Sequence, residues 1–149
     1  MYQTIVVGTD GSESARVAVR HAAYLASCAG SQLHLVTAVS ATPIGVGPDM
    51  VHALPPSWVD ANVDKARATL DTVAAEVRES GVEVTTHIAQ GEPAESLLRY
   101  CEDARADLLV VGDKGMHGPR RFLLGSVANR CAHHATCAVL VVPTKCGAP

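Results

Sequence analysis

The sequence predicts an α/β protein built on a doubly wound parallel sheet, and two observations lead to this prediction. Short apolar runs rich in branched residues recur along the 149-residue chain, and segments of helical periodicity separate them. Runs that are apolar throughout are typical of strands buried on both faces, as in a parallel sheet. Strands that alternate with helices in this way form a doubly wound sheet with right-handed crossovers. The length fits one domain of about 100–200 residues, so residues 1–149 are expected to form a single domain.

The predicted strands differ in how deeply they are buried. Val82–Ile88 alternates apolar Val82, Val84 and Ile88 with polar residues, so this strand is expected to have one wet face and to lie at an edge of the sheet. That placement gives the strand order 3-2-1-4-5, which is Rossmann-like. The other runs are apolar throughout: Ile5-Val6-Val7, Leu33–Val39, Leu108–Val111 and Val139–Val142.

Four segments with apolar stripes at helical spacing lie between the strands. Residues suited to helix ends flank them, because a glycine after the last turn allows a left-handed cap and a proline fits the first turn. In order, they are a stripe of small residues from Ala15 to Ala29 that ends at Gly30, a stripe from Val59 to Val77 between Ser57 as the cap and Gly81, a helix opened by Pro93, and a helix that starts near Ser126.

Composition excludes several classes of protein. Because 48% of the residues are apolar and only 18% are charged, the chain can bury a core and is not disordered. Twelve basic residues face 15 acidic ones, and aromatic residues are few, so no nucleic-acid partner is expected. No apolar run approaches the roughly 20 residues that cross a membrane, so no membrane partner is expected either. Five cysteines without a CxxC pair indicate reduced thiols in the cytoplasm.

Two glycine-rich segments are expected to form the functional site. In a doubly wound sheet, ligands bind beyond the carboxyl ends of the strands where the strand order reverses, here between the first and fourth strands. Gly8–Ser12 leaves the first strand and carries Thr9 and Asp10, whereas Gly112–Ser126 leaves the fourth strand. Because both segments leave strands at the same edge of the sheet, they are expected to face each other across one crevice.

The second segment has the features of a phosphate-binding loop. Glycines let backbone amides approach an anion, and unpaired N–H groups at a helix start attract negative charge. The residues concerned are Gly112 and Gly115 in the loop, Gly125 and Ser126 at the helix start, and Arg120 and Arg121 as sources of positive charge.

Both segments also have a purely structural interpretation. The glycines of the second segment can serve ordinary turns, with Ser126 as a plain N-cap. Asp10 can cap the first helix, because Glu13 follows three residues later as in a capping box. The sequence alone leaves both alternatives open.

The spacing in the second segment matches a family pattern. Gly112, Gly115, Gly125 and Ser126 form Gly-x2-Gly-x9-Gly-Ser, and in this context the chain resembles the ATP-binding branch of the universal stress protein family. The resemblance covers nearly the whole chain, although Ala138 stands where a proline is common. Four stretches carry it: Ile5–Ser12, Ala106–Gly112, Leu123–Ala128 and Cys137–Pro143.

The resemblance implies a ligand and a role for each part of the site. The expected ligand is ATP or AMP, with Mg²⁺ bridging its phosphates, since this ion needs few protein ligands. Asp10, beside Thr9, would face the ribose or the phosphate-bound metal, and backbone groups near Ala38 and Val39 would meet the adenine edge. The phosphates would be held, mainly through backbone amides, by Gly112, Gly115, Gly125, Ser126 and Val127.

Three functions are compatible with these residues. The expected one is nucleotide sensing in the stress response with at most slow ATP hydrolysis, because no base is evident that could position an attacking water. The second is a nucleotide hydrolase or nucleotidyl transferase that uses Asp10 with Arg120 or Arg121. The third is an interaction module that keeps the fold but binds no nucleotide. P-loop, dinucleotide-binding and nucleophile-elbow motifs are not present in the sequence.

Two further features of the sequence concern a zinc site and the assembly of two chains. Cys131, His133, His134 and Cys137 lie close together in the sequence but lack the usual zinc-finger spacing, so no protein metal site is expected. Val139–Val142 is apolar and lies at the other edge of the predicted sheet, where an exposed edge invites pairing. A homodimer through antiparallel fifth strands would cover it, as the family resemblance also implies. The alternative is that the Thr144–Pro149 tail shields this strand.

Overall fold

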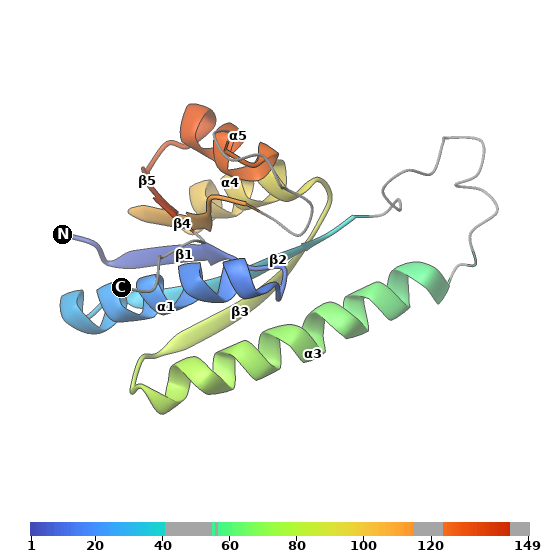
Figure 1. The fold of residues 1–149 in the computed structure, drawn as a ribbon, viewed down its shortest axis with the longest axis horizontal. Coiled ribbons are helices and arrows are strands. Elements are labelled where there is room, and N and C mark those ends of the chain that lie inside the picture. The colour runs from blue at the N-terminus through green and yellow to red at the C-terminus, as the bar shows by residue number, and fades with distance from the viewer. Residues whose placement is uncertain (41–54, 56, 115–123, 144–149) are drawn as a thin grey trace.

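The computed structural model describes residues 1–40, 55, 57–114 and 124–143, and within these residues it shows a parallel sheet of five strands. The strand order is β3-β2-β1-β4-β5, and every neighbouring pair is parallel (Figure 1). The predicted fold class and strand order are therefore confirmed. The strands are β1 (Thr4–Gly8), β2 (Gln32–Val39), β3 (Val84–Gln90), β4 (Leu108–Gly112) and β5 (Ala138–Val142).

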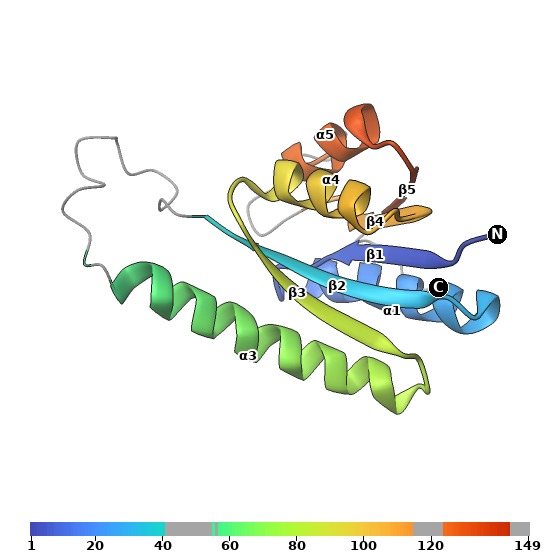
Figure 2. The ribbon, with the colours of Figure 1, turned by 180° about the vertical axis from the view of Figure 1, so that it is seen from behind.

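Helices cover both faces of the sheet in two layers (Figures 1 and 2). The apolar cluster on one face joins alternate strand residues to α1 and α3, and the cluster on the other face joins the intervening residues to α4 and α5. The four predicted helices are thus all present among the described residues: α1 (Glu13–Ala29), α3 (Ser57–Glu79), α4 (Pro93–Asp103) and α5 (Ser126–His134).

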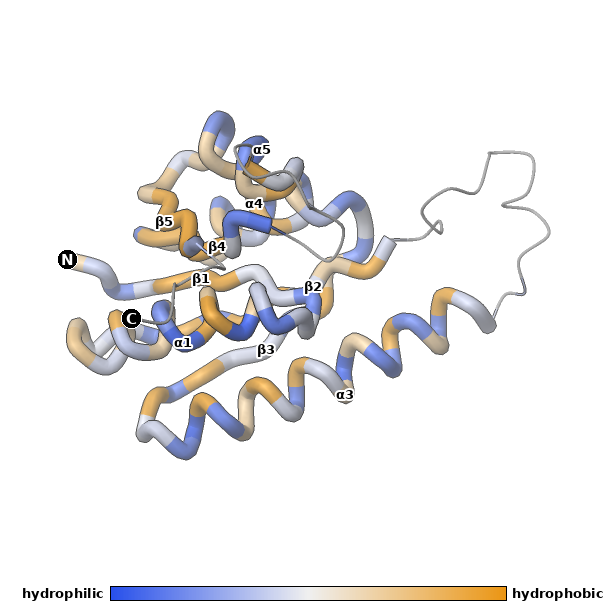
Figure 3. The backbone as a smooth tube through the Cα atoms, in the orientation of Figure 1, coloured by the Kyte–Doolittle hydropathy of each residue, from blue (hydrophilic) through white to orange (hydrophobic). Residues whose placement is uncertain are grey.

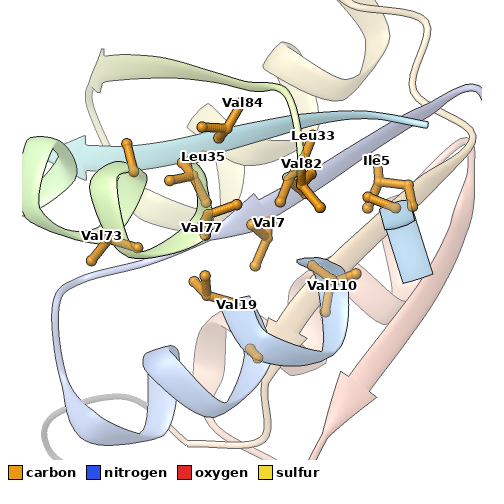
Figure 4. Close-up of a cluster of buried hydrophobic side chains, with 14 of the residues drawn as sticks. Ile5, Val7, Val19, Leu33, Leu35, Val73, Val77, Val82, Val84 and Val110 are labelled. Carbon is orange, nitrogen blue, oxygen red and sulfur yellow. The ribbon is translucent and has the colours of Figure 1, made fainter. Parts of the chain in front are cut away.

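Alternation along the central strands fills the two clusters. Ile5 and Val7 of β1 point into the cluster beneath α1 and α3, where Figure 4 shows Val7 close to Val19 and Val77. Val6 points into the other cluster, and all three β1 residues are fully buried. Figure 3 shows the same pattern as apolar strands between helices of mixed polarity. Burial on both faces explains why this run is apolar throughout.

The position and exposure of β3 agree with the alternation in its sequence. β3 lies at one edge of the sheet, and its Thr85 and His87 side chains are exposed while Val84 is buried. The strand begins and ends two residues later than the predicted Val82–Ile88 range.

The helix ends were predicted with mixed success. Gly30 caps α1 in the left-handed conformation with φ 66°, and Pro93 occupies the first turn of α4, as predicted. Ser57, predicted to be the cap of α3, is instead its first helical residue. Ala29, the last residue of the predicted stripe of small residues, is exposed and lies in the last turn of α1 beside Gly30.

The buried stripe of α3 is shorter than predicted. Ala66, Leu70, Val73 and Val77 are buried, but Val59 in the first turn is only half-buried, and so is Val63 one turn further on. Figures 1 and 2 show the reason, since the first turns of α3 extend further than the strands beneath them. Within the described residues, no helix combines the length and the apolar character needed to span a membrane.

A carboxylate fastens the amino ends of the two central strands. Asp107, just before β4, accepts hydrogen bonds at Oδ2 from the backbone N–H of Thr4 at 2.9 Å and of Gln3 at 2.7 Å. Its own N–H donates to the Thr4 carbonyl at 2.9 Å. The two N–H donors, that of Thr4 first, lower the pKa of Asp107 below its usual value, because they stabilise the ionised form.

The Asp107→Ala variant is expected to unfold at a lower denaturant concentration than the wild type at pH 7. A carboxyl group with a lowered pKa in the folded state stabilises the protein above its unfolded-state pKa of about 4, and this contribution disappears as the pH falls through the folded-state pKa. The difference between variant and wild type should therefore shrink in acid. Urea titrations between pH 7 and pH 3 measure it, with Asp71→Ala on the exposed face of α3 as the control. A difference that grew in acid would contradict the assignment.

Candidate functional site

The strand order reverses between β1 and β4, and the segments that leave these two strands meet. A Cβ atom added to Gly112 would lie 3.5 Å from the carbonyl oxygen of Ser14, in the first turn of α1. The end of β4 therefore packs against the start of the helix that follows β1. This contact lies at the switch point, where the sequence predicted the ligand crevice.

Hydrogen bonds bring the start of α5 back to the end of β4. The N–H of Gly125 donates to the carbonyl of Asp113 at 2.8 Å, and the N–H of Asp113 donates to the carbonyl of Val142 at 2.8 Å. Gly112 and Gly125 are thus brought together although a long segment separates them. Gly115, Arg120 and Arg121 lie within that segment and outside the described residues, so their predicted roles stay predictions.

The first turn of α5 has no side-chain cap from its N-cap residue. Its N-cap is Gly125, which makes no side-chain cap hydrogen bond, and its first turn contains no acidic residue. By contrast, Ser12 caps α1 through its side chain and Glu92 caps α4 in the same way. The N-terminal N–H groups of a helix attract anions when no side chain occupies them.

Ser126 does not have the plain N-cap role that the structural alternative gave it, because it is the first residue of α5. Gly125 has φ −59° and ψ 158°, a conformation open to any residue. Backbone geometry therefore does not require glycine here. A side chain with an oxygen at this position would cap the helix, and glycine leaves the N–H groups of Ser126 and Val127 unoccupied by a cap.

The loop after β1 is tightly held and presents Asp10. Ser12 is the N-cap of α1, so the capping role considered for Asp10 is wrong. The Asp10 side chain is exposed, and its Oδ1 accepts a hydrogen bond from the Ser12 N–H at 2.9 Å. Gly11 has φ 78°, and a Cβ there would lie 2.6 Å from Cγ2 of Thr69 on α3. Glycine at position 11 therefore lets α3 close onto this loop.

At the end of β2, the backbone groups of Ala38 and Val39, both expected to meet adenine, point to opposite sides of the strand. The N–H of Gly91 donates to the carbonyl of Val39 at 3.0 Å, whereas the N–H of Thr9 donates to the carbonyl of Val36 at 2.9 Å. Backbone groups alternate sides along a strand, so those of Ala38 point toward the β1 side, like those of Val36. The last registered pair of β1 and β2 is Gly8 with Val36, so Ala38 reaches past the end of β1. Ala38, rather than Val39, is directed toward the crevice.

Sequence reasoning missed three contacts that shape this edge of the sheet. The hydroxyl of Thr37 donates to the carbonyl of Thr9 at 2.8 Å, and Arg130 of α5 pairs with Glu92 at 2.9 Å. A Cβ at Gly8 would lie 2.8 Å from Cδ1 of Leu97, so glycine lets α4 approach β1. Gly8 within the first glycine-rich segment was a usable signal. The two side-chain contacts join residues far apart in the sequence and left no local pattern.

The zinc alternative gains no support from the geometry. Among the described residues, no three His, Cys, Asp or Glu side chains are grouped so as to hold a metal ion. Burial raises the pKa of Cys131 to about 11, and burial also raises the pKa of Cys137. Both thiols are therefore protonated near neutral pH, whereas the thiolate is the form that binds a metal.

A groove of about 340 Å³ lies elsewhere, between α1 and α3. Its lining includes Val19, Tyr24 and Val77, but no described residue of the loops after β1 and β4. The residues that the sequence predicted for the site do not line this groove, so the candidate site stays at the carboxyl edge of the sheet.

The sheet topology and the helices on both faces define a class of protein, the doubly wound α/β proteins. The model of the universal stress protein family matches residues 1–143. The chain belongs to the universal stress protein family.

Individual relatives agree with this membership. Universal stress protein MJ0531 of Methanocaldococcus jannaschii is 32% identical over 95% of this chain and 82% of its own length. The universal stress protein UspA from Lactobacillus plantarum superposes with a TM-score of 0.83 at 26% identity, covering 95% of this chain and 97% of its own. A universal stress protein in complex with cAMP superposes with a TM-score of 0.71 at 30% identity, covering 97% and 98%.

Proposed function

We propose that this protein binds ATP or AMP in the crevice between β1 and β4 and acts as a nucleotide-dependent regulator of the stress response. The observation that carries the proposal is the uncapped start of α5, fastened beside the end of β4 by the Gly125 to Asp113 hydrogen bond. The related structure with cAMP supports an adenine nucleotide as the ligand class. The cysteine pattern in the sequence supports a reducing, cytoplasmic location.

The phosphates would lie against the first turn of α5. The N–H groups of Ser126 and Val127 point out of the helix start, where the helix dipole adds positive potential. Within the described residues no side chain caps this helix start, and its first turn carries no acidic residue. We assign the phosphate contacts to these amides together with Gly112, and by the sequence pattern to Gly115, Arg120 and Arg121.

The nucleoside would lie toward β2. Backbone groups of Ala38 are directed past the end of β1 and can pair with the adenine edge. The exposed carboxylate of Asp10 lies on the neighbouring loop and can accept from ribose hydroxyls or hold a phosphate-bound Mg²⁺. One carboxylate is sufficient for the ion, since Mg²⁺ usually takes one or two carboxylates and completes its shell with phosphate oxygens and water.

The Gly125→Asp variant tests the phosphate site. An aspartate at the N-cap should stabilise α5 by accepting from its free N–H groups, and it should repel the phosphates from the same groups. We expect ATP affinity, measured by titration calorimetry, to fall at least about tenfold, equivalent to about 1.4 kcal/mol, while the thermal midpoint stays equal or rises.

Gly125→Ser is the matched control, because serine caps the helix without adding a charge. Its affinity should lie between those of the wild type and the aspartate variant. Unchanged ATP affinity in Gly125→Asp, in a protein that folds as the wild type does, would contradict the proposed phosphate position.

Catalysis is expected to be slow at most. Fast phosphoryl transfer needs a group that positions the attacking nucleophile. Asp10 is the titratable side chain that we assign to the ligand, and we assign it to the ribose or the metal ion rather than to an attacking water. Release of phosphate from ATP by the pure protein should stay below about 1 s⁻¹, the low end of ordinary enzyme turnover. A faster rate, lost in Asp10→Asn, would favour the hydrolase or transferase alternative. Absence of any nucleotide binding would favour the nucleotide-free interaction module.

We further propose that two chains pair through β5. This strand is apolar along its length (Figure 3), and Val139, Leu140 and Val141 are only half-buried in the single chain. β5 lies at the edge of the sheet, so its outer backbone groups can pair with another strand. Antiparallel pairing of two β5 strands would create a two-fold dimer.

A Val141→Asp substitution should shift the protein toward the monomer in sedimentation experiments, because it places a charge in the apolar contact. Ala75→Asp, on the exposed face of α3, is the control and should leave the sedimentation profile unchanged. A dimer that persisted unchanged in Val141→Asp would argue against pairing through β5.

A further inference from the structure

Thr37 of β2 makes a buried hydrogen bond to the loop after β1, the loop that carries Asp10. Its side chain is 7% exposed, and its hydroxyl donates to the carbonyl of Thr9 at 2.8 Å. Thr9 is itself 6% exposed. A threonine in the middle of an apolar strand is a costly choice unless its hydroxyl is paired, and here the partner is the first residue of the proposed ligand loop.

Every other polar group of Thr9 is also engaged. Its N–H donates to the carbonyl of Val36 at 2.9 Å, and its Oγ1 accepts from the N–H of Gly11 at 3.2 Å. The Thr37 hydroxyl supplies the remaining constraint, because it fixes the direction in which the Thr9 carbonyl points. The orientation of the peptide between Thr9 and Asp10 is therefore set by a side chain from the neighbouring strand.

The orientation of the peptide between Thr9 and Asp10 determines where the N–H of Asp10 points. In a planar trans peptide the C=O and N–H groups point in opposite directions. With the Thr9 carbonyl directed at the buried Thr37 hydroxyl, the N–H of Asp10 is directed away from it. Within the described part of the chain, no hydrogen-bond acceptor takes this N–H. The exposed Asp10 thus offers both a backbone donor and a carboxylate from one fixed position.

We propose that Thr37 is a positioning residue for the nucleotide: its hydroxyl orients the Thr9–Asp10 peptide so that Asp10 presents its N–H to the ligand. This inference rests on the proposed function, because it assigns a role within the same crevice. Thr37 also directly precedes Ala38, whose backbone is directed toward the proposed adenine position. Thr37 therefore links Ala38, which we place beside the adenine, to the loop that carries the Asp10 carboxylate.

Two substitutions separate the hydroxyl from the shape of the side chain. Thr37→Val keeps the branched shape but removes the donor, which leaves the buried Thr9 carbonyl without its partner and frees the peptide to turn. Thr37→Ser keeps the donor and loses only a methyl group. Thr86→Val on β3 is the control, because it makes the same chemical change on a strand away from the loop.

Titration calorimetry with ATP and Mg²⁺ measures the effect. We expect Thr37→Val to bind about tenfold more weakly than the wild type, with Thr37→Ser and Thr86→Val within about threefold of it. Denaturant titrations on the same proteins measure the free energy of unfolding, so that a change in ATP affinity can be compared with any change in stability. Wild-type affinity in Thr37→Val would overturn the proposal. So would equal weakening in Thr37→Ser, since the hydroxyl would then not be the active group.

Hydrogen exchange on the nucleotide-free proteins gives a readout that needs no ligand. The Gly11 amide donates to Thr9 and reports on the loop. We expect its exchange to be faster in Thr37→Val than in Thr37→Ser or Thr86→Val, and unchanged exchange in Thr37→Val would overturn the proposal. If the wild type binds no adenine nucleotide, the proposed function fails and the nucleotide role of Thr37 fails with it. If the wild type binds and Thr37→Val binds equally well, only the role of Thr37 fails.

Discussion

The hydrogen bond from Gly125 to the Asp113 carbonyl is the constraint on which the site depends. It closes the segment after β4 and places the first turn of α5 beside Gly112, while Asp113 is fastened in turn to the end of β5. Without this closure, the helix start and the strand end would be two unrelated features of one long connection. With it, the first turn of α5 lies beside the end of β4, the strand at which the strand order reverses. The parallel sheet supplies the edge, and this bond supplies the geometry at that edge.

The starts of α1, α4 and α5 at that edge differ in how they are capped. Ser12 and Glu92 cap α1 and α4 with their own side chains, which satisfies donors that would otherwise face solvent. Gly125 provides no such cap for α5, although its backbone conformation would accept serine or aspartate. A helix start that forgoes a cap loses about 1 kcal/mol of stability, and the anion that we propose at this position would offset that loss. The chain belongs to the universal stress protein family, and a related universal stress protein has been solved in complex with cAMP.

Much of the architecture was predictable because strands and helices each leave a local periodicity of apolar residues in the sequence. Apolar runs gave the strands, the alternation in Val82–Ile88 gave the edge, and together they gave the strand order. The position of the switch point between β1 and β4 followed from that order. The side-chain contacts did not, because Thr37 with Thr9 and Glu92 with Arg130 join residues whose separation leaves no pattern in the chain. The buried length of α3 was overestimated for a related reason: periodicity describes the helix and not the extent of the sheet beneath it.

Amide chemical shifts of ¹⁵N-labelled protein, followed during a titration with ATP and Mg²⁺, test the central claim most directly. The account predicts that the largest and saturable changes occur at Ser126 and Val127, with accompanying changes at Asp10 and Ala38. Changes confined to the groove between α1 and α3, or no change at millimolar nucleotide, would contradict it.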